Sequence, residues 1–194
     1  MEEELENQQS WRDDDTKCTF IVLARDACGT IPSGGADDSD FVTRNLHAMV
    51  GDVNLFVSDE EDEEEVDPFA PPKELPPPQK QAEVDIMIAE SAYHGKGLGK
   101  EATSLMMLFG AKKLGFRRYF CKINEDNAAS KSLFENKLGF IEKQYVAVFK
   151  QYELELKKET NHDLEDYLSS RVDDLRILEC PLELESDPAT EKSK

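Results

Sequence analysis

The sequence predicts an α+β fold with a mixed sheet, organised around one strand, one glycine turn and one helix. Residues 83–88 alternate apolar and polar side chains, which is typical of a half-buried strand. Residues 100–114 carry apolar side chains at helical spacing and stop at Gly115, a residue type that commonly ends helices. Residues 117–123 are expected to form a third inner strand that lies parallel to 83–88, because the helix between them forms a right-handed crossover.

The segments before this centre predict a hairpin. Residues 18–24 are apolar and β-branched, as in a buried strand, and residues 49–57 form a second strand. We expect the two to pair across a loop at 25–46, after a polar helical fragment at 1–10.

The segments after the centre predict a helix and two closing strands. Asn127 and Gly139 have the residue types that start and stop helices, and they enclose residues 128–138. Residues 140–143 and 145–156 read as strands. Leu164, Tyr167 and Leu168 repeat at helical spacing, but no place in the core is expected for them.

Composition limits the class of protein. The 194 residues carry a net charge of −19 and predict one domain with extensions. This charge argues against nucleic acid and anionic membranes as partners and allows a basic peptide. The four cysteines lack metal-site spacing, so no metal site is expected. Without a signal peptide or membrane span, we expect an intracellular protein, cytoplasmic or nuclear.

The turn between the central strand and helix is a candidate anion site. Gly95, Gly97 and Gly99 place three glycines in five residues, so the backbone can approach a ligand closely. Successive N–H groups and a helix N-terminus there suit a phosphate, and Lys96 and Lys100 add positive charge. The spacing matches neither a P-loop nor the dinucleotide fingerprint, and a tight connection without a ligand is the alternative interpretation.

Two motifs in this region resemble those of the Gcn5-related N-acetyltransferases, the GNAT superfamily. Residues 93–100 resemble its acetyl-CoA signature, Arg/Gln-x-x-Gly-x-Gly/Ala, with Gly97 and Gly99 at the fixed positions and His94 where Arg or Gln is usual. Residues 127–140 resemble the motif that follows it. Runs at 10–23, 49–56 and 87–90 are similar to the N-acetyltransferase 9-like members, and the resemblance covers about residues 5–156 without the acidic insert.

The resemblance implies a fold, an activity and a domain plan. The sheet should be mostly antiparallel with one parallel, splayed pair of strands and flanking helices. The activity should be transfer of an acetyl group from acetyl-CoA to an amine, expected to belong to a protein or peptide. The N-acetyltransferase domain would span residues 1–156, with a disordered acidic and proline-rich insert at 58–82 and a charged, largely disordered tail at 157–194.

The resemblance also implies which residues hold acetyl-CoA. The backbone amides of the glycine turn bind the pyrophosphate, and a strand N–H near Ile88 polarises the thioester carbonyl. Asn127 is either a helix cap or a hydrogen-bonding group on the cofactor side. The expected cofactor-binding residues are Ile88, His94, Gly95, Lys96, Gly97, Leu98, Gly99, Lys100, Asn127 and Ser130.

Glu83 and Asp85 are the candidate catalytic bases that would take the proton of the amine. They lie two residues apart on one face of the central strand, and Glu83 precedes His94 by eleven residues, a spacing at which some histone-type relatives carry a catalytic Glu. Solvated strand carboxylates without a catalytic role are the alternative.

Three departures from the family pattern matter for activity. The family begins with a strand and a helix before the segment that matches residues 5–11, so the chain looks short at its N-terminus. Phe134 stands where many relatives have a Tyr that acts as general acid. Residues 135–137 include one residue more than usual, which predicts a helical bulge. Two alternatives therefore stay open: a catalytically weak or inactive acetyl-CoA-binding or interaction module, and a form that does not fold stably alone.

Overall fold

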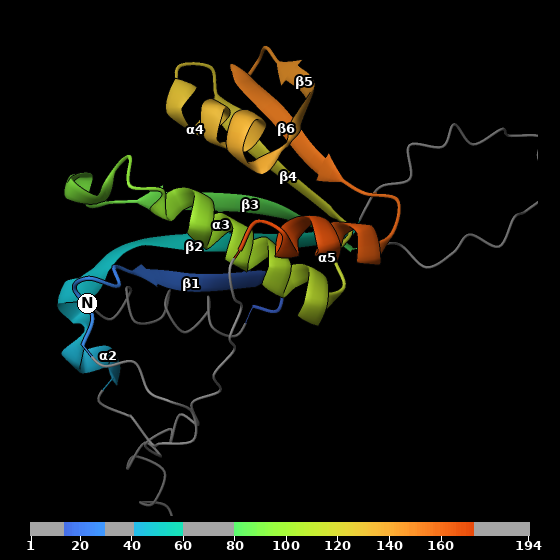
Figure 1. Cartoon of the computed structure of the whole chain (residues 1–194). Coiled ribbons are helices and arrows are strands. Elements are labelled where there is room, and N and C mark those ends of the chain that lie inside the picture. Colours follow the sequence, from blue (N-terminus) through green and yellow to red (C-terminus); the bar gives the residue numbers. More distant parts are fainter. Residues whose placement is uncertain (1–13, 30–40, 60–79, 173–194) are drawn as a thin grey trace, which may run out of the picture. The chain divides into compact units, whose positions relative to one another are not determined.

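The computed structural model describes residues 14–29, 41–59 and 80–172, and the structural statements here concern those residues (Figure 1). They form two compact units. The larger contains residues 14–22 and 50–172, and the smaller contains residues 23–29 and 41–49. None of the helices in the described part of the chain is both long enough and apolar enough to span a membrane.

The larger unit is built on a six-stranded sheet that confirms the predicted fold class. The strands follow the order β1-β2-β3-β4-β6-β5, and β3 and β4 form its parallel pair within a mostly antiparallel arrangement. The predicted pairing of the first two strands is present, and the Val57 N–H donates to the Thr16 carbonyl at 2.7 Å. The strands are β1 (Lys17–Leu23), β2 (Met49–Asp59), β3 (Lys80–Ile88), β4 (Arg118–Asn124), β5 (Ile141–Val146) and β6 (Gln151–Lys157).

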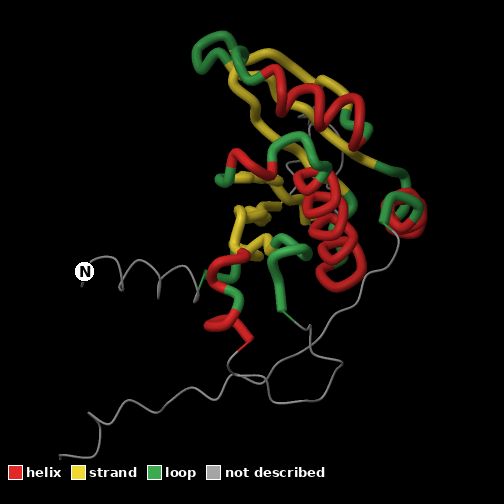
Figure 2. The backbone as a smooth tube through the Cα atoms, turned by 60° about the vertical axis from the view of Figure 1, so that its left-hand side comes forward, coloured by secondary structure: helices red, strands yellow, loops and turns green. Residues whose placement is uncertain are grey.

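The α-helices described in the larger unit lie in three stretches, two of which end in π-helical turns, and a short 3-10 helix, η2 (Ser91–Tyr93), precedes them. Helix α3 (Leu98–Phe109) continues as the π-helix η3 (Gly110–Leu114) and ends at Gly115, as predicted. Helix α4 (Ala128–Ser132) continues as the π-helix η4 (Leu133–Leu138), which confirms the bulge expected from the additional residue at 135–137. Figure 2 shows α3 running alongside the strands.

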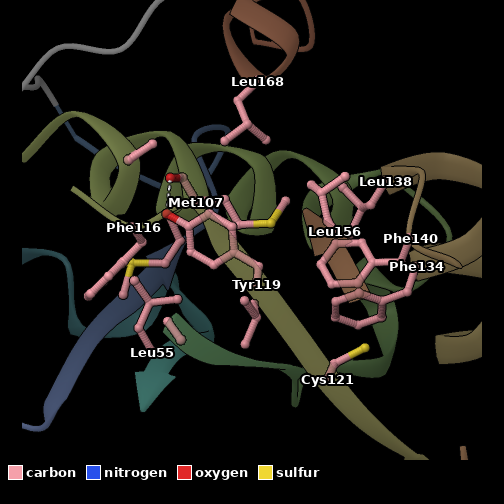
Figure 3. Packing of buried hydrophobic residues seen from close by; sticks show 14 of the residues in the cluster. Leu55, Met107, Phe116, Tyr119, Cys121, Phe134, Leu138, Phe140, Leu156 and Leu168 are labelled. Carbon is pink, nitrogen blue, oxygen red and sulfur yellow. Dashed lines mark hydrogen bonds between the residues drawn. The ribbon is translucent and has the colours of Figure 1, made fainter. Parts of the chain in front are cut away.

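The core lies between the sheet and these helices (Figure 3). Tyr119 of β4 is fully buried, and its hydroxyl donates to the Met107 carbonyl of α3 at 2.6 Å. Burial raises the pKa of Tyr119, so the hydroxyl stays protonated and keeps this bond. The rings of Phe134 and Phe140 pack edge to face at 5.0 Å, which joins η4 to the start of β5.

The parallel pairing of β3 and β4 is short, and the two strands then separate. Pairing covers only Gln81–Glu83 against Arg118–Phe120, although both strands continue beyond it. Figure 1 shows β3 and β4 together at one end and apart at the other. The splayed pair that the family resemblance implied is therefore present, and its opening faces the glycine turn before α3.

A buried arginine fastens the strands where they still pair. Arg118 is 7% exposed, and its Nε donates to Glu155 Oε2 of β6 at 2.8 Å. Its Nη1 donates to Gln81 Oε1 of β3. The guanidinium thus joins β3, β4 and β6 at the closed end of the splay.

Helix α5 (Asn161–Ser169) corrects the sequence interpretation of this region. Leu164 and Leu168 are fully buried in the core, whereas the sequence pattern gave them no place there. The Tyr167 hydroxyl donates to the Leu138 carbonyl at 2.9 Å, at the end of η4. The expected disorder of the tail is therefore wrong for this helix, and residues 173–194 lie outside the described part.

Several predicted boundaries also change. Strand β2 ends at Asp59 and strand β3 begins at Lys80, so both ends of the predicted insert 58–82 are strand. Residues 60–79 and the predicted fragment 1–10 lie outside the described part. The expected loop 25–46 contains a short helix, α2 (Phe41–Arg44). Strand β5 continues to Val146, and a turn then leads to β6, which starts at Gln151 rather than at residue 145.

We predict that Gly51→Ala destabilises the sheet by about 2–3 kcal/mol, because a Cβ there would lie 1.9 Å from the Met87 carbonyl oxygen of β3. Urea unfolding of both variants measures this. Gly29→Ala is the control, since its Cβ would meet its nearest neighbour, Asn45 Oδ1, at 3.7 Å, and it should cost less than about 0.5 kcal/mol. Equal stability of the two variants would contradict the close approach of β2 and β3.

Leu168→Ala should lower the free energy of unfolding by about 3 kcal/mol, because it removes a fully buried side chain that fastens α5 to the core. The same urea experiment applies. Val148→Ala, at a side chain that is 88% exposed, should change stability by less than about 0.5 kcal/mol. A neutral Leu168→Ala would mean that α5 is not docked in solution.

Candidate active site

The end of β3 presents a backbone N–H group to the opening between β3 and β4. The Met87 carbonyl points at Gly51 of β2, since a Cβ on Gly51 would lie 1.9 Å from its oxygen. In a trans peptide the N–H lies opposite the carbonyl, so the Ile88 N–H points away from β2 and toward the opening. The Ile88 carbonyl, on the same edge, accepts a hydrogen bond from His94 Nε2 at 2.7 Å.

The glycine turn is shaped to present backbone N–H groups at the start of α3. Gly95 and Gly97 have φ of 72° and 90°, and both positions leave open space where a Cβ would stand. Gly97 is the residue that precedes α3, so the N–H groups of Leu98, Gly99 and Lys100 lie in the first helical turn and need partners outside it. Such a terminus binds anions through these groups and the helix dipole.

The turn, β3 and the helix formed by α4 and η4 line an open pocket of about 510 Å³. This volume lies in the range of small-molecule sites. Ile86, Leu98 and Leu133 give it an apolar side, and the N–H groups of the turn give it a polar one. The lining residues are Ile86, Ile88, Tyr93, His94, Gly95, Gly97, Leu98, Gly99, Lys100, Ala129, Ser130, Ser132, Leu133 and Lys137.

The charge of this pocket is opposite to that of the whole chain. Lys100 and Lys137 line it, and no Asp or Glu appears among its described lining residues. The chain as a whole carries −19. A pocket with two lysines and several N–H donors therefore suits a ligand with several negative charges. The apolar side chains of β3 in its lining suit an extended, uncharged part of the same ligand.

Most of the predicted cofactor residues meet in this pocket. Eight of the ten line it, and the two exceptions are Lys96 and Asn127. The Lys96 ammonium lies over the Tyr93 ring, 4.4 Å from its centroid. Asn127 caps α4, with its Oδ1 accepting from the Ser130 N–H at 3.1 Å, so of its two open roles the structure contains the cap.

The two candidate bases, Glu83 and Asp85, lie outside the pocket, on the other face of β3 from the buried Val84. Glu83, the last paired residue of β3, accepts at 2.8 Å from Nζ of Lys122, which lies two residues past the last paired residue of β4. Asp85 Oδ1 accepts from the Ile86 N–H at 3.0 Å. Because Ile86 and Ile88 are two residues apart, their N–H groups share the open edge, and Asp85 therefore reaches the opening.

The sequence interpretation missed six lining residues, and Lys137 is the one with a charge. Within the predicted helix 128–138 the sequence assigns a role toward the ligand to Ser130 alone, and no periodic signal marks which side of a π-helix faces a pocket. The π-helical turn η4 contains both Lys137 and Leu133 of the lining. The others missed are Ile86, Tyr93, Ala129 and Ser132.

The residue at the position where relatives carry a general acid and the thiol of Cys121 both belong to the core. Phe134 is 3% exposed and packs on Phe140 rather than lining the pocket. Burial raises the pKa of the Cys121 thiol far above its ordinary value, so the thiol stays protonated and is no nucleophile. Within the described residues, no group of three or more His, Cys, Asp or Glu side chains is placed to hold a metal ion.

Comparison with known proteins agrees with this geometry. The family model described as acetyltransferase (GNAT) domain matches residues 3–141. An N-acetyltransferase 9-like protein of Caenorhabditis briggsae is 42% identical over 82% of this chain and 67% of its own length. The human alpha/beta-tubulin-N-acetyltransferase 9 is 35% identical over 80% of this chain and 63% of its own length. The chain belongs to the GNAT family of acetyltransferases.

Solved structures agree with the fold. A spermidine N-acetyltransferase from Vibrio cholerae, in complex with CoA and spermine, superposes with a TM-score of 0.54 at 14% identity, over 83% of this chain and 77% of that one. Campylobacter jejuni PseH in complex with acetyl coenzyme A gives a TM-score of 0.52 at 12% identity, over 81% and 79%. The protein is an acetyl-CoA-dependent N-acetyltransferase, and its cationic, N–H-lined pocket fits the anionic part of acetyl-CoA.

We predict that Gly97→Glu weakens acetyl-CoA binding at least tenfold, because a side chain at φ 90° costs about 1–2 kcal/mol and brings a negative charge to an anion site. Isothermal titration measures the affinity. Gly115→Glu is a matched control, since Gly115 also has positive φ and open space at its Cβ, but lies outside the pocket. It should bind as the wild type does, and an equal loss in both variants would point to misfolding.

Lys137→Gln and Lys100→Gln should each weaken acetyl-CoA binding about three- to tenfold, since each removes a cation from the pocket wall at about 1 kcal/mol. The loss should shrink at high salt, because salt screens exposed charges. Lys113→Gln, at an exposed lysine of η3 outside the pocket, serves as control and should bind normally. A wild-type affinity in Lys137→Gln would remove that residue from the site.

Proposed function

We propose that this protein acetylates an amine of another protein, and that the amine enters the opening between β3 and β4 from the sheet face that carries Glu83 and Asp85. The observation that carries this proposal is the splay itself, which joins the pocket on one face to the acidic edge on the other. Relatives named alpha/beta-tubulin-N-acetyltransferase 9, 35% identical to this chain in mouse, fly and human, support a protein acceptor.

In this proposal backbone N–H groups both bind acetyl-CoA and stabilise the charge that develops during transfer. The pyrophosphate of acetyl-CoA binds the N–H groups of residues 95–100, together with Lys100 and Lys137. The Ile88 N–H donates to the thioester carbonyl and stabilises the negative charge that develops there when the amine attacks. Transfer then forms the amide and releases the thiolate of CoA.

We assign the role of general base to Asp85 in preference to Glu83. The Glu83 carboxylate is paired with Lys122, whereas among the described residues Asp85 is not paired with a cation. Its carboxylate bonds to the Ile86 N–H, and the Ile88 N–H follows two residues, about 7 Å, further along the same edge. An amine at the thioester could thus pass its proton to Asp85 directly or through one water.

The charge distribution supports a basic acceptor segment. Asp52 lies opposite Met87 on β2, so it shares the sheet face of Asp85, and within the described residues neither carboxylate is paired with a cation. The net charge of −19 favours encounter with basic partners and disfavours nucleic acid and anionic membrane. Cys18, Cys28 and Cys121 are free thiols, which is in keeping with an intracellular site, cytoplasmic or nuclear.

The experiment is acetylation of purified α/β-tubulin by the whole chain with labelled acetyl-CoA, followed by mass spectrometry to locate the modified amine. A set of peptides with free N-terminal or lysine amines gives the acceptor class.

We predict that Asp85→Asn lowers kcat about a hundredfold, and that Glu83→Gln lowers it less. Glu159→Gln, at an exposed carboxylate outside the pocket, is the control. Full activity in Asp85→Asn would refute its role.

A second candidate function is an acetyl-CoA-binding module with little or no turnover. Phe134 favours it, because this side chain has no proton to give to the departing thiolate and lies in the core. Acetyl-CoA binding that is lost in Gly97→Glu, without acetylation of tubulin or of any peptide, would support the module.

A further inference from the structure

We propose that His94 is a positioning residue for acetyl transfer: its imidazole holds the end of β3 so that the Ile88 N–H stays aimed into the opening. The proposal rests on the function given above, in which Ile88 polarises the thioester. It differs from the expectation that His94 is a direct cofactor contact.

The hydrogen bond between His94 and Ile88 has one possible direction. His94 Nε2 lies 2.7 Å from the Ile88 carbonyl oxygen, and a carbonyl accepts but never donates. The proton must therefore sit on Nε2, which leaves Nδ1 as the free ring nitrogen of the neutral form.

This bond replaces one that the sheet itself no longer supplies. Up to Glu83, β3 has a neighbour on each edge, but beyond the last paired residues β4 has moved away. The Ile88 carbonyl is on the edge that β4 has left, so without His94 it would have no strand partner. A side chain from the glycine turn thus takes the place of a neighbouring strand.

The peptide group between Ile88 and Ala89 is held from both sides as a result. Its carbonyl accepts from His94, and its N–H donates to the Val50 carbonyl of β2 at 2.8 Å. Fixing this plane restricts ψ of Ile88, and the pairing of Met87 with Asp52 fixes the peptide before it. The Ile88 N–H belongs to the Met87–Ile88 peptide, and because this peptide and the next one are both held, it has little freedom to turn away from the opening.

His94 also joins the two halves of the site along the chain. It directly precedes Gly95, the first glycine of the turn, while its ring bonds to the strand that carries the polarising N–H. One side chain therefore fixes the position of the turn that would hold the pyrophosphate relative to the strand that would hold the acetyl group. Misplacing a reacting group by about 1 Å costs on the order of a hundredfold in rate.

Two substitutions distinguish the effect of the hydrogen-bond donor from the effect of the ring. His94→Gln keeps an N–H donor of similar reach but loses the ring, and His94→Phe keeps a ring of similar size but loses the donor. We expect His94→Phe to lower kcat about ten- to a hundredfold with acetyl-CoA affinity within about threefold of wild type. His94→Gln should keep both values within about threefold. Thermal unfolding checks that each variant is folded.

Other outcomes would overturn the proposal. Equal loss of kcat in both variants would assign the effect to packing of the ring. A weaker acetyl-CoA affinity with unchanged kcat would make His94 a ligand contact, and wild-type kcat in His94→Phe would remove any role in positioning.

Amide hydrogen exchange at Ala89 tests the geometry without relying on activity. Exchange should become about tenfold faster in His94→Phe and stay unchanged in His94→Gln, because the donor, not the ring, holds this peptide. Unchanged exchange in His94→Phe would overturn the proposal. If the wild type acetylates nothing while His94→Phe alone exchanges faster, the proposed function fails and the positioning contact stands.

Discussion

The whole site depends on one constraint: β3 and β4 pair over three residues and then part. A continuous parallel ladder would satisfy every backbone group of β3 within the sheet and leave nothing for a ligand. Because the ladder stops, N–H and carbonyl groups near Ile88 face an opening, and the helices that follow each strand start on either side of it. Arg118, which bonds to both Gln81 and Glu155, keeps the strands together where they still pair, so that the parting begins at a fixed place.

The second determinant is the contrast between a local and a global charge. The chain is strongly acidic, yet the described lining of the pocket has lysines and backbone N–H groups and no carboxylate. The carboxylates near the site lie on the opposite face of β3, where Glu83 is paired with Lys122. A strand that alternates its side chains between two faces is what allows both environments within a few residues. An anionic co-substrate and a basic acceptor can therefore approach the same peptide group from different sides.

Side chains of residues 167–171 stabilise one wall of the pocket. Tyr167 and Arg171 bond to the carbonyls of Leu138 and Lys137, at the end of the π-helical turn that contributes Lys137 to the lining. A π-helical turn leaves carbonyls without their regular partners at its end, and these side chains satisfy them. Helix α5 therefore supports the pocket, because its Tyr167 bonds to the π-helix η4 that forms part of the pocket wall.

Features that depend on neighbours along the chain could be predicted from the sequence. Alternation in 83–88, the helix that ends at Gly115 and the glycine turn are local patterns, and family motifs located eight of the pocket residues and the additional residue behind η4. Other features could not be predicted in this way. Contacts between segments distant in sequence decide where β3 leaves β4 and which surface covers Leu168. The bond from His94 to Ile88 spans only six residues, but it forms on the edge of β3 that β4 has left. The periodicity of one segment shows that it has a face to bury or a group to satisfy, but the partner is set by how the whole sheet twists and packs.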